Sequence, residues 1–174
     1  IIADKACLQM KMLNTGKGPG VQCLRAQEDK LDYPKLMLEY AENTKNLTIL
    51  EGMVDDLLHD DNHVYGVKIK DKEYTSKAVI LTTGTYLNSK TLRGHDFKIE
   101  GPDGEPTTYG LSAQLKRLGF DVTRLKTGTP PRIDKSTIDF SKTRIENGDS
   151  TPYTFSYAND IYYDVDNQVP CHLI

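Results

Sequence analysis

Apolar and polar residues follow two different patterns along this chain, and together the patterns predict an α/β protein. Residues 25–44 carry apolar positions at helical spacing. Pro34 should start or kink a helix there, so we expect two helical pieces in this range. A further helix is expected over residues 110–118, because Leu111, Leu115 and Leu118 share one helical face.

Short apolar segments between these helices predict strands. They cover residues 46–50, 53–58, 64–70 and 73–76. The Asp60-Asp61-Asn62 cluster has the composition of a hairpin turn, so the strands around it should form a small antiparallel meander. Residues 77–83 are rich in β-branched side chains and lack alternation, which suits a strand that is buried on both faces of a sheet and ends at Gly84.

The composition fits a soluble globular protein. The 174 residues suffice for one packed domain, with 37% hydrophobic residues and a mean hydropathy of −0.54. The longest apolar run, residues 78–81, is far too short for a membrane span. We therefore expect a cytoplasmic protein without membrane attachment.

The three cysteines, Cys7, Cys23 and Cys171, are widely separated and lack paired metal-ligand spacing. This argues against a disulfide framework and against a zinc site. Cys171 is a conceivable nucleophile, but nothing near it in the sequence, His172 included, indicates an activated thiolate. We assign no catalytic residue in this chain.

Charge is nearly balanced, with 22 Lys and Arg residues against 25 Asp and Glu residues and a pI of about 5.8. This balance argues against a dedicated nucleic-acid-binding domain. Basic residues concentrate downstream, at Lys116–Arg117, Arg124, Lys126 and Arg132. Such a cluster suits phosphate groups, but a solvated charged surface has the same composition, and the sequence leaves both interpretations open.

The segment from Leu125 to Asp134 has few backbone conformations available. Pro130 and Pro131 remove two donors and fix φ, while Gly128 permits conformations closed to other residues. A stiff segment that carries two cations and several hydroxyls is suited to an anionic ligand. An ordinary surface turn has the same composition, so this alternative also stays open.

The exact residue strings of three segments are more specific than their general physical properties. They are RLKTGTPPRID at 124–134 with STIDFS at 136–141, MLNTGKGPGV at 12–21 with LRAQ at 24–27, and AVILTTGTYL at 78–87. In this order and at this spacing they resemble the GidA/MnmG family, flavoproteins that modify the wobble uridine of certain tRNAs. The similarity continues to the C-terminus and covers essentially the whole chain.

The resemblance implies an α/β fold in two parts. Residues 1–134 would be part of a two-dinucleotide-type FAD-binding domain with a small antiparallel β-meander, and residues 135–174 the truncated start of an inserted domain. No Gly-x-Gly-x-x-Gly motif follows an early strand, and Pro19 removes a donor from the glycine-rich segment 16–20. We therefore expect a fragment that lacks the pyrophosphate-binding loop and is inactive alone.

Candidate site residues follow from the same resemblance. Val54 falls at a family FAD contact made by the backbone, and Thr108 aligns with a flavin-contacting Ser, although a helix N-cap role suits Thr108 equally well. Gly84 and Thr85, in the turn after the expected buried strand, are further cofactor candidates. Candidates for tRNA contact are Lys17, Arg25, Arg124, Lys126 and Arg132. One departure is Lys11, where the family usually has Arg.

For the whole protein, the resemblance implies an FAD-dependent enzyme that installs a carboxymethylaminomethyl or aminomethyl group at C5 of uridine-34 in tRNA. NADH and methylene-tetrahydrofolate would be co-substrates, the GTPase MnmE a partner, and a homodimer the assembly. Two alternatives remain: a folate- and FAD-dependent tRNA uridine methyltransferase relative, and a non-enzymatic scaffold that binds tRNA or protein. The full LKTGTPPRID-STIDFS string is not expected in the methyltransferase.

Overall fold

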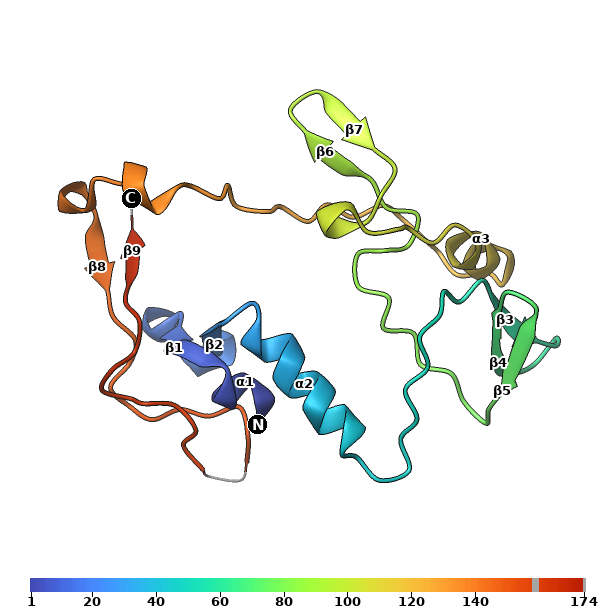
Figure 1. Cartoon of the computed structure of the whole chain (residues 1–174), viewed down its shortest axis with the longest axis horizontal. Coiled ribbons are helices and arrows are strands. Elements are labelled where there is room, and N and C mark those ends of the chain that lie inside the picture. Colours follow the sequence, from blue (N-terminus) through green and yellow to red (C-terminus); the bar gives the residue numbers. More distant parts are fainter. Residues whose placement is uncertain (158–159, 174) are drawn as a thin grey trace. The chain divides into compact units, whose positions relative to one another are not determined.

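The computed structural model describes residues 1–157 and 160–173, and its contacts divide the chain into two compact units (Figure 1). Unit 1 comprises Ile1–Ile49 and Arg132–Ile174, and unit 2 comprises Leu50–Pro131. Both contain small antiparallel sheets with helices, in agreement with the predicted α/β class. The domain boundary expected after residue 134 stays a prediction.

Unit 1 contains two antiparallel strand pairs and two helices. The pairs are β1 (Cys7–Leu13) with β2 (Cys23–Glu28), and β8 (Arg144–Glu146) with β9 (Cys171–Leu173). The helices are α1 (Ile2–Lys5) and α2 (Asp32–Glu42). A short loop closes the β1–β2 hairpin, with Asn14 in the left-handed region at φ 59° and its side-chain amide donating to the Val21 carbonyl at 3.0 Å.

The C-terminal segment is attached to β1 by hydrogen bonds. The Val169 N–H donates to the Leu8 carbonyl at 2.9 Å, and the Asp149 N–H donates to the Met10 carbonyl at 2.9 Å. The Met12 N–H donates to Asp149 Oδ2 at 2.7 Å. The backbone N–H and C=O groups of successive strand residues point to opposite sides. Those of residues 8, 10 and 12 therefore face the edge of β1 that does not pair with β2.

The helical prediction for residues 25–44 was partly wrong. Residues 25–28 belong to β2 because they pair with β1, Arg25 opposite Lys11, and this long-range pairing overrides local helix propensity. A single helix then begins at Asp32, with Pro34 in its first turn, where the missing N–H costs no helical hydrogen bond. The predicted strand at 46–50 has no regular structure.

Unit 2 contains the predicted meander. It consists of β3 (Asp56–His59), β4 (Val64–Ile69) and β5 (Lys72–Thr75), paired in the order β3-β4-β5. The predicted turn is confirmed, since Asp60 Oδ1 accepts the N–H groups of Asn62 and His63 at 2.8 Å. A second hairpin joins β6 (Thr91–Arg93) to β7 (Asp96–Lys98), and α3 (Gly110–Arg117) confirms the helix predicted over residues 110–118.

The buried strand predicted for residues 77–83 is not observed. This segment has no assigned secondary structure, and Ile80 is 85% exposed. A strand buried on both faces needs a hydrogen-bonding neighbour on each side, and no strand among the described residues pairs with this one. The turn after it is confirmed, with Gly84 at φ +53°.

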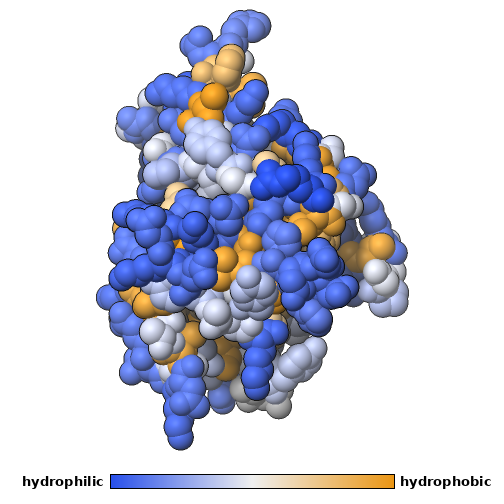
Figure 2. All heavy atoms as spheres, turned by 90° about the vertical axis from the view of Figure 1, so that its right-hand side faces the viewer, coloured by the Kyte–Doolittle hydropathy of each residue, from blue (hydrophilic) through white to orange (hydrophobic). Residues whose placement is uncertain are grey.

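Both units have small cores in which polar side chains take part. The buried apolar residues are Ile2, Ala6 and Met10 in unit 1 and Leu57 and Leu111 in unit 2, and the buried polar residues are Asp4, Gln9, Thr107 and Gln114. Many large apolar side chains are exposed, and Figure 2 shows hydrophobic residues interspersed with hydrophilic ones on one face. In the part of the chain that the structure describes, no helix is sufficiently long and apolar to cross a membrane.

Candidate functional site

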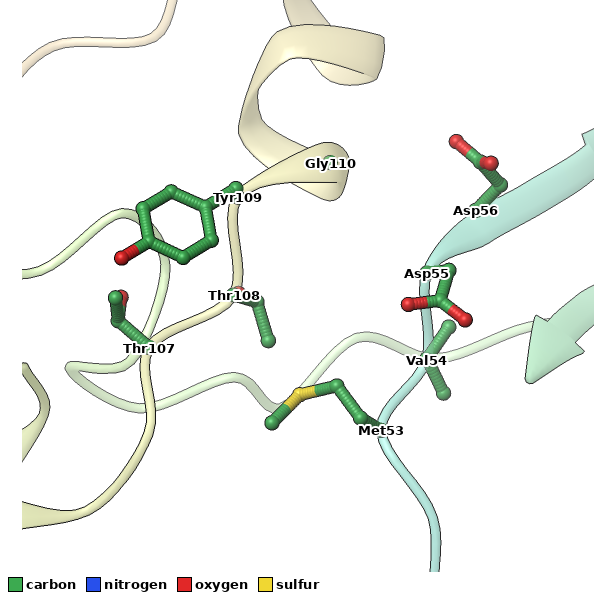
Figure 3. Close-up of a pocket in the computed structure, with 8 residues that line it drawn as sticks. All are labelled: Met53, Val54, Asp55, Asp56, Thr107, Thr108, Tyr109 and Gly110. Atoms are coloured by element: carbon green, nitrogen blue, oxygen red, sulfur yellow. The ribbon is translucent and has the colours of Figure 1, made fainter. Parts of the chain in front are cut away.

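Unit 2 contains a cavity of about 260 Å³ between two short chain segments (Figure 3). One wall is formed by residues 53–56 and the other by residues 107–110. The cavity therefore brings together Val54 and Thr108, the two residues for which the family resemblance implied a flavin contact. The side chains of Met53 and Thr108 point toward one another from opposite walls (Figure 3).

The first wall is fixed by its continuation into the meander. The Asp55 N–H donates to the Lys68 carbonyl at 2.9 Å, and Asp55 Oδ2 accepts the Lys70 N–H at 2.7 Å. Val54 precedes this anchored residue. Within residues 1–157 and 160–173, neither the N–H nor the carbonyl of Val54 has a hydrogen-bond partner, so both are available to a ligand.

The second wall is fixed by Tyr86. The Tyr86 carbonyl accepts the Thr107 hydroxyl at 2.7 Å and the Thr108 N–H at 3.1 Å. The hydroxyl of Thr108 lies 3.4 Å from the same carbonyl, a long and weak contact. This hydroxyl is therefore free to turn toward a molecule in the cavity.

The N-cap alternative for Thr108 was wrong. The residue at the N-cap of α3 is Tyr109, whose side chain makes no capping hydrogen bond. Thr108 lies one residue earlier and its N–H and carbonyl bond with residues 86 and 88. The first turn of α3 consequently presents uncapped N–H groups near the cavity.

Gly84 and Thr85 do not line the cavity. They form the turn before Tyr86, closed by a hydrogen bond from the Tyr86 N–H to the Thr83 carbonyl at 3.2 Å. Both residues therefore lie in the turn that leads to Tyr86, whose carbonyl holds the second wall. Their role as direct cofactor contacts stays a prediction.

Sequence reasoning missed the close approach of the two walls. A Cβ at Gly110 would lie 2.5 Å from the Asp55 carbonyl oxygen, so glycine is required for α3 to begin at this distance from the first wall. Asp55, Asp56 and Tyr109 also line the cavity and were not predicted. The two neighbouring carboxylates give the first wall negative charge.

Two of the basic residues proposed for tRNA lie in unit 2. Arg124 donates from Nη1 to the Asn88 carbonyl at 3.0 Å, which ties it to the loop before β6. Lys126 is exposed in a segment without regular structure.

The other three basic candidates belong to unit 1, so neither unit gathers all five. Lys17 is exposed in the 3-10 turn Thr15–Lys17. Arg25 is partly buried in β2, and its Nε is shielded from solvent without a hydrogen-bond partner. Arg132 is exposed. Lys11, which lies opposite Arg25 in the β1–β2 pair, forms an ion pair with Glu146 at 3.0 Å. This contact lowers the pKa of the Glu146 carboxyl.

The sequence signature around residue 134 contains two repeated turns. Asp134 Oδ1 accepts the N–H and the hydroxyl of Ser136 at 2.9 and 2.8 Å. Asp139 Oδ1 accepts the same two groups of Ser141 at 3.1 and 2.6 Å. These bonds hold the pKa of both aspartates below the usual value. The STIDFS motif therefore has a local structural role that we did not predict.

The thiol of Cys7 is not activated. Burial, reinforced by the nearby Glu28 carboxylate, raises the pKa of Cys7 to about 11. The Cys171 thiol is half-buried and donates to Gln9 Oε1 at 3.5 Å. Among the described residues no group of His, Cys, Asp or Glu side chains is arranged to hold a metal ion. All three cysteines are free in the structure.

These features define a small α/β unit with a cavity between the segment that leads into β3 and the N-terminus of α3. The family model described as "Glucose inhibited division protein A" matches residues 1–174. The chain belongs to this family, as the three sequence segments predicted.

The curated relatives that match this chain are named as enzymes. The chain is 54% identical over 160 residues to the tRNA uridine 5-carboxymethylaminomethyl modification enzyme MnmG of Acholeplasma laidlawii, covering 91% of this chain and 26% of that protein. It is 47% identical over 171 residues to MnmG of Bacillus licheniformis, covering 98% of this chain and 27% of that protein. The chain thus spans about a quarter of the length of these relatives.

A solved structure has a similar fold. Aquifex aeolicus GidA, in its form I crystal, matches with a TM-score of 0.83 and 40% identity over 98% of this chain and 30% of that chain. The form II crystal matches with a TM-score of 0.84. The chain therefore matches a segment of the MnmG and GidA proteins, to whose family it belongs.

Proposed function

We propose that the cavity lined by residues 53–56 and 107–110 binds part of FAD. The observation that supports this most strongly is that Val54 and Thr108, chosen from the family resemblance, line one cavity although they are far apart in sequence. Val54 offers an unpaired backbone donor and acceptor, the pair of groups that a heteroaromatic ring edge requires. Thr108 offers a weakly engaged hydroxyl.

The size and charge of the cavity indicate which part of FAD fits. A volume of about 260 Å³ is below the range of roughly 300–1,000 Å³ typical of complete small-molecule pockets. The carboxylates of Asp55 and Asp56 repel a pyrophosphate. The cavity therefore suits an uncharged, hydrogen-bonding portion of the cofactor, and its phosphates bind elsewhere in the longer protein.

FAD, when bound, supplies the redox chemistry. The residues of this chain bind and orient it: the Val54 backbone fixes a ring edge, and the Thr108 hydroxyl donates or accepts one hydrogen bond. We assign no proton transfer or nucleophilic step to this segment, in agreement with the raised pKa of Cys7.

The longer protein, in this proposal, modifies C5 of uridine-34 in tRNA in the cytoplasm. NADH and methylene-tetrahydrofolate act as co-substrates, MnmE as the GTPase partner, and the enzyme is a homodimer. The names of the relatives support tRNA as the substrate and C5 of a uridine as the modified atom. Residues 1–134 belong to the FAD-binding domain and residues 135–174 begin an inserted domain. Lys17, Arg25, Arg124, Lys126 and Arg132 are the candidates for tRNA contact.

The experiment that tests this function uses the full-length protein that contains this chain. We expect the purified protein to carry FAD and to restore the carboxymethylaminomethyl or aminomethyl group at uridine-34 in tRNA from a strain that lacks the enzyme. Nucleoside analysis of the tRNA by mass spectrometry measures this directly. Uridine-34 left unmodified, with the protein folded and flavin-loaded, would contradict the proposal.

A further inference from the structure

Gln114, on α3, makes two hydrogen bonds to a single residue of β3. Its Oε1 accepts the Leu57 N–H at 2.7 Å, and its Nε2 donates to the Leu57 carbonyl at 2.8 Å. Gln114 is only 5% exposed and Leu57 only 6%. The side-chain amide thus imitates a neighbouring strand at the edge of β3 that β4 leaves free.

A second contact lies one helical turn before Gln114. Gly110 sits against the Asp55 carbonyl so closely that a Cβ would lie 2.5 Å from it. Gly110 and Gln114 are four residues apart on one helical face, a rise of about 6 Å. Asp55 immediately precedes β3 and Leu57 lies two residues later within it, about 6.6 Å along an extended chain. Because these two repeats match, α3 runs beside the first wall and is held at two points.

An apolar side chain at position 114 cannot perform this role. The Leu57 N–H and carbonyl face away from β4, and burying them without partners costs free energy. Only a side chain with a donor and an acceptor in one plane satisfies both groups, and the amide of glutamine has this arrangement.

We propose that Gln114 is a positioning residue for the FAD cavity. It does not line the cavity, but it joins the two elements that form the walls: residues 53–56 lead into β3, and residues 107–110 lead into α3. Loss of the Gln114–Leu57 pair lets the walls separate, which moves Thr108 away from Val54. This inference rests on the proposed function of the cavity.

The test uses Gln114→Glu, which replaces the side-chain amide with a carboxyl group that can be protonated or ionised. The neutral carboxylic acid restores both bonds, because its hydroxyl donates to the Leu57 carbonyl and its other oxygen accepts the N–H. The carboxylate cannot donate, and it repels the Leu57 carbonyl. Burial raises the pKa of such a group, so the neutral form is present at mildly acidic pH. The charged and titratable groups on the elements packed here, Asp55, Asp56, His59, Lys68, Lys116 and Arg117, are common to wild type and variant.

The measurement is the Kd for FAD of the full-length wild type and variants, determined at several pH values after removal of bound flavin. We expect the ratio of the variant Kd to the wild-type Kd to be close to one near pH 6 and to rise to about tenfold or more near pH 9. Gln114→Leu should have a raised ratio at every pH. Gln27→Glu, at an exposed position of unit 1, is the matched control and should leave the ratio at one.

The outcomes separate the two proposals. A wild-type protein that binds no FAD overturns the proposed function of the cavity. A wild type that binds FAD, with a Gln114→Glu ratio that stays near one at all pH values, overturns the role of Gln114 alone. If Gln114→Leu fails to fold, the pH dependence of Gln114→Glu still decides the question.

Discussion

The side chain of Gln168 accepts a hydrogen bond from the Met10 N–H at 2.6 Å. Met10 is completely buried in β1, and the Gln168 amide also donates to the carbonyls of Asp149 and Val165 at 2.9 and 3.0 Å. A single glutamine near the C-terminus therefore joins the free edge of β1 to two points of the segment that follows β8.

We predict that Gln168→Ala destabilises unit 1 by about 1–3 kcal/mol, because it leaves the buried Met10 N–H without a partner. Hydrogen exchange of the full-length protein should show loss of protection at residues 10–12. Gln27→Ala, which removes an exposed amide from β2, is the control. Equal protection in both variants would mean that this hydrogen bond does not hold the C-terminal segment.

Gly110→Ala should open the cavity of unit 2. Its Cβ would meet the Asp55 carbonyl oxygen at 2.5 Å, so α3 or the first wall must shift, at a cost of roughly 1–3 kcal/mol. We expect a lower melting temperature and less FAD after purification. Gly20→Ala is the matched control, since no atom lies within 4 Å of a Cβ there. Retention of normal flavin content by Gly110→Ala would show that the wall distance is unimportant.

Thr108→Ala should weaken FAD binding by about 0.5–1.5 kcal/mol, the contribution of one neutral hydrogen bond. Thr108→Ser keeps the hydroxyl and should retain wild-type affinity. The Kd for FAD of the full-length protein, from fluorescence titration, is the measurement. If the alanine variant binds as tightly as the serine variant, the hydroxyl does not contact the cofactor.

Lys126→Ala and Arg132→Ala should each weaken tRNA binding while FAD content and melting temperature stay nearly unchanged. A lost phosphate contact should flatten the plot of log affinity against log salt by about 0.7–0.9. Lys35→Ala, on the exposed surface of α2, removes the same charge and is the control. If Lys126→Ala and Arg132→Ala both keep the wild-type salt dependence, residues 125–134 form a structural turn and do not contact tRNA.

Local sequence signals predicted the elements that local chemistry controls. The Asp60 turn, the meander around it and α3 depend on nearby residues, and all three are present. Residues 25–28 could not be assigned in this way, because their strand depends on pairing with β1. The expected strand at 77–83 likewise depends on partners, and none of the described strands supplies one.

In the candidate site, too, the sequence predicted local features but not those that depend on long-range contacts. Val54 and Thr108 could be proposed from family segments, but their meeting in one cavity depends on contacts between distant parts of unit 2. Gln114 was missed because a polar residue in a helix ordinarily predicts exposure. Only its long-range partner, the backbone of Leu57, explains why it is buried.

The most direct test of the central claim is a crystal structure of the full-length protein with FAD bound. We predict that electron density for part of the cofactor fills the cavity between residues 53–56 and 107–110, within hydrogen-bond distance of the Val54 backbone and the Thr108 hydroxyl. FAD bound elsewhere, with this cavity closed or filled only by solvent, would contradict the account.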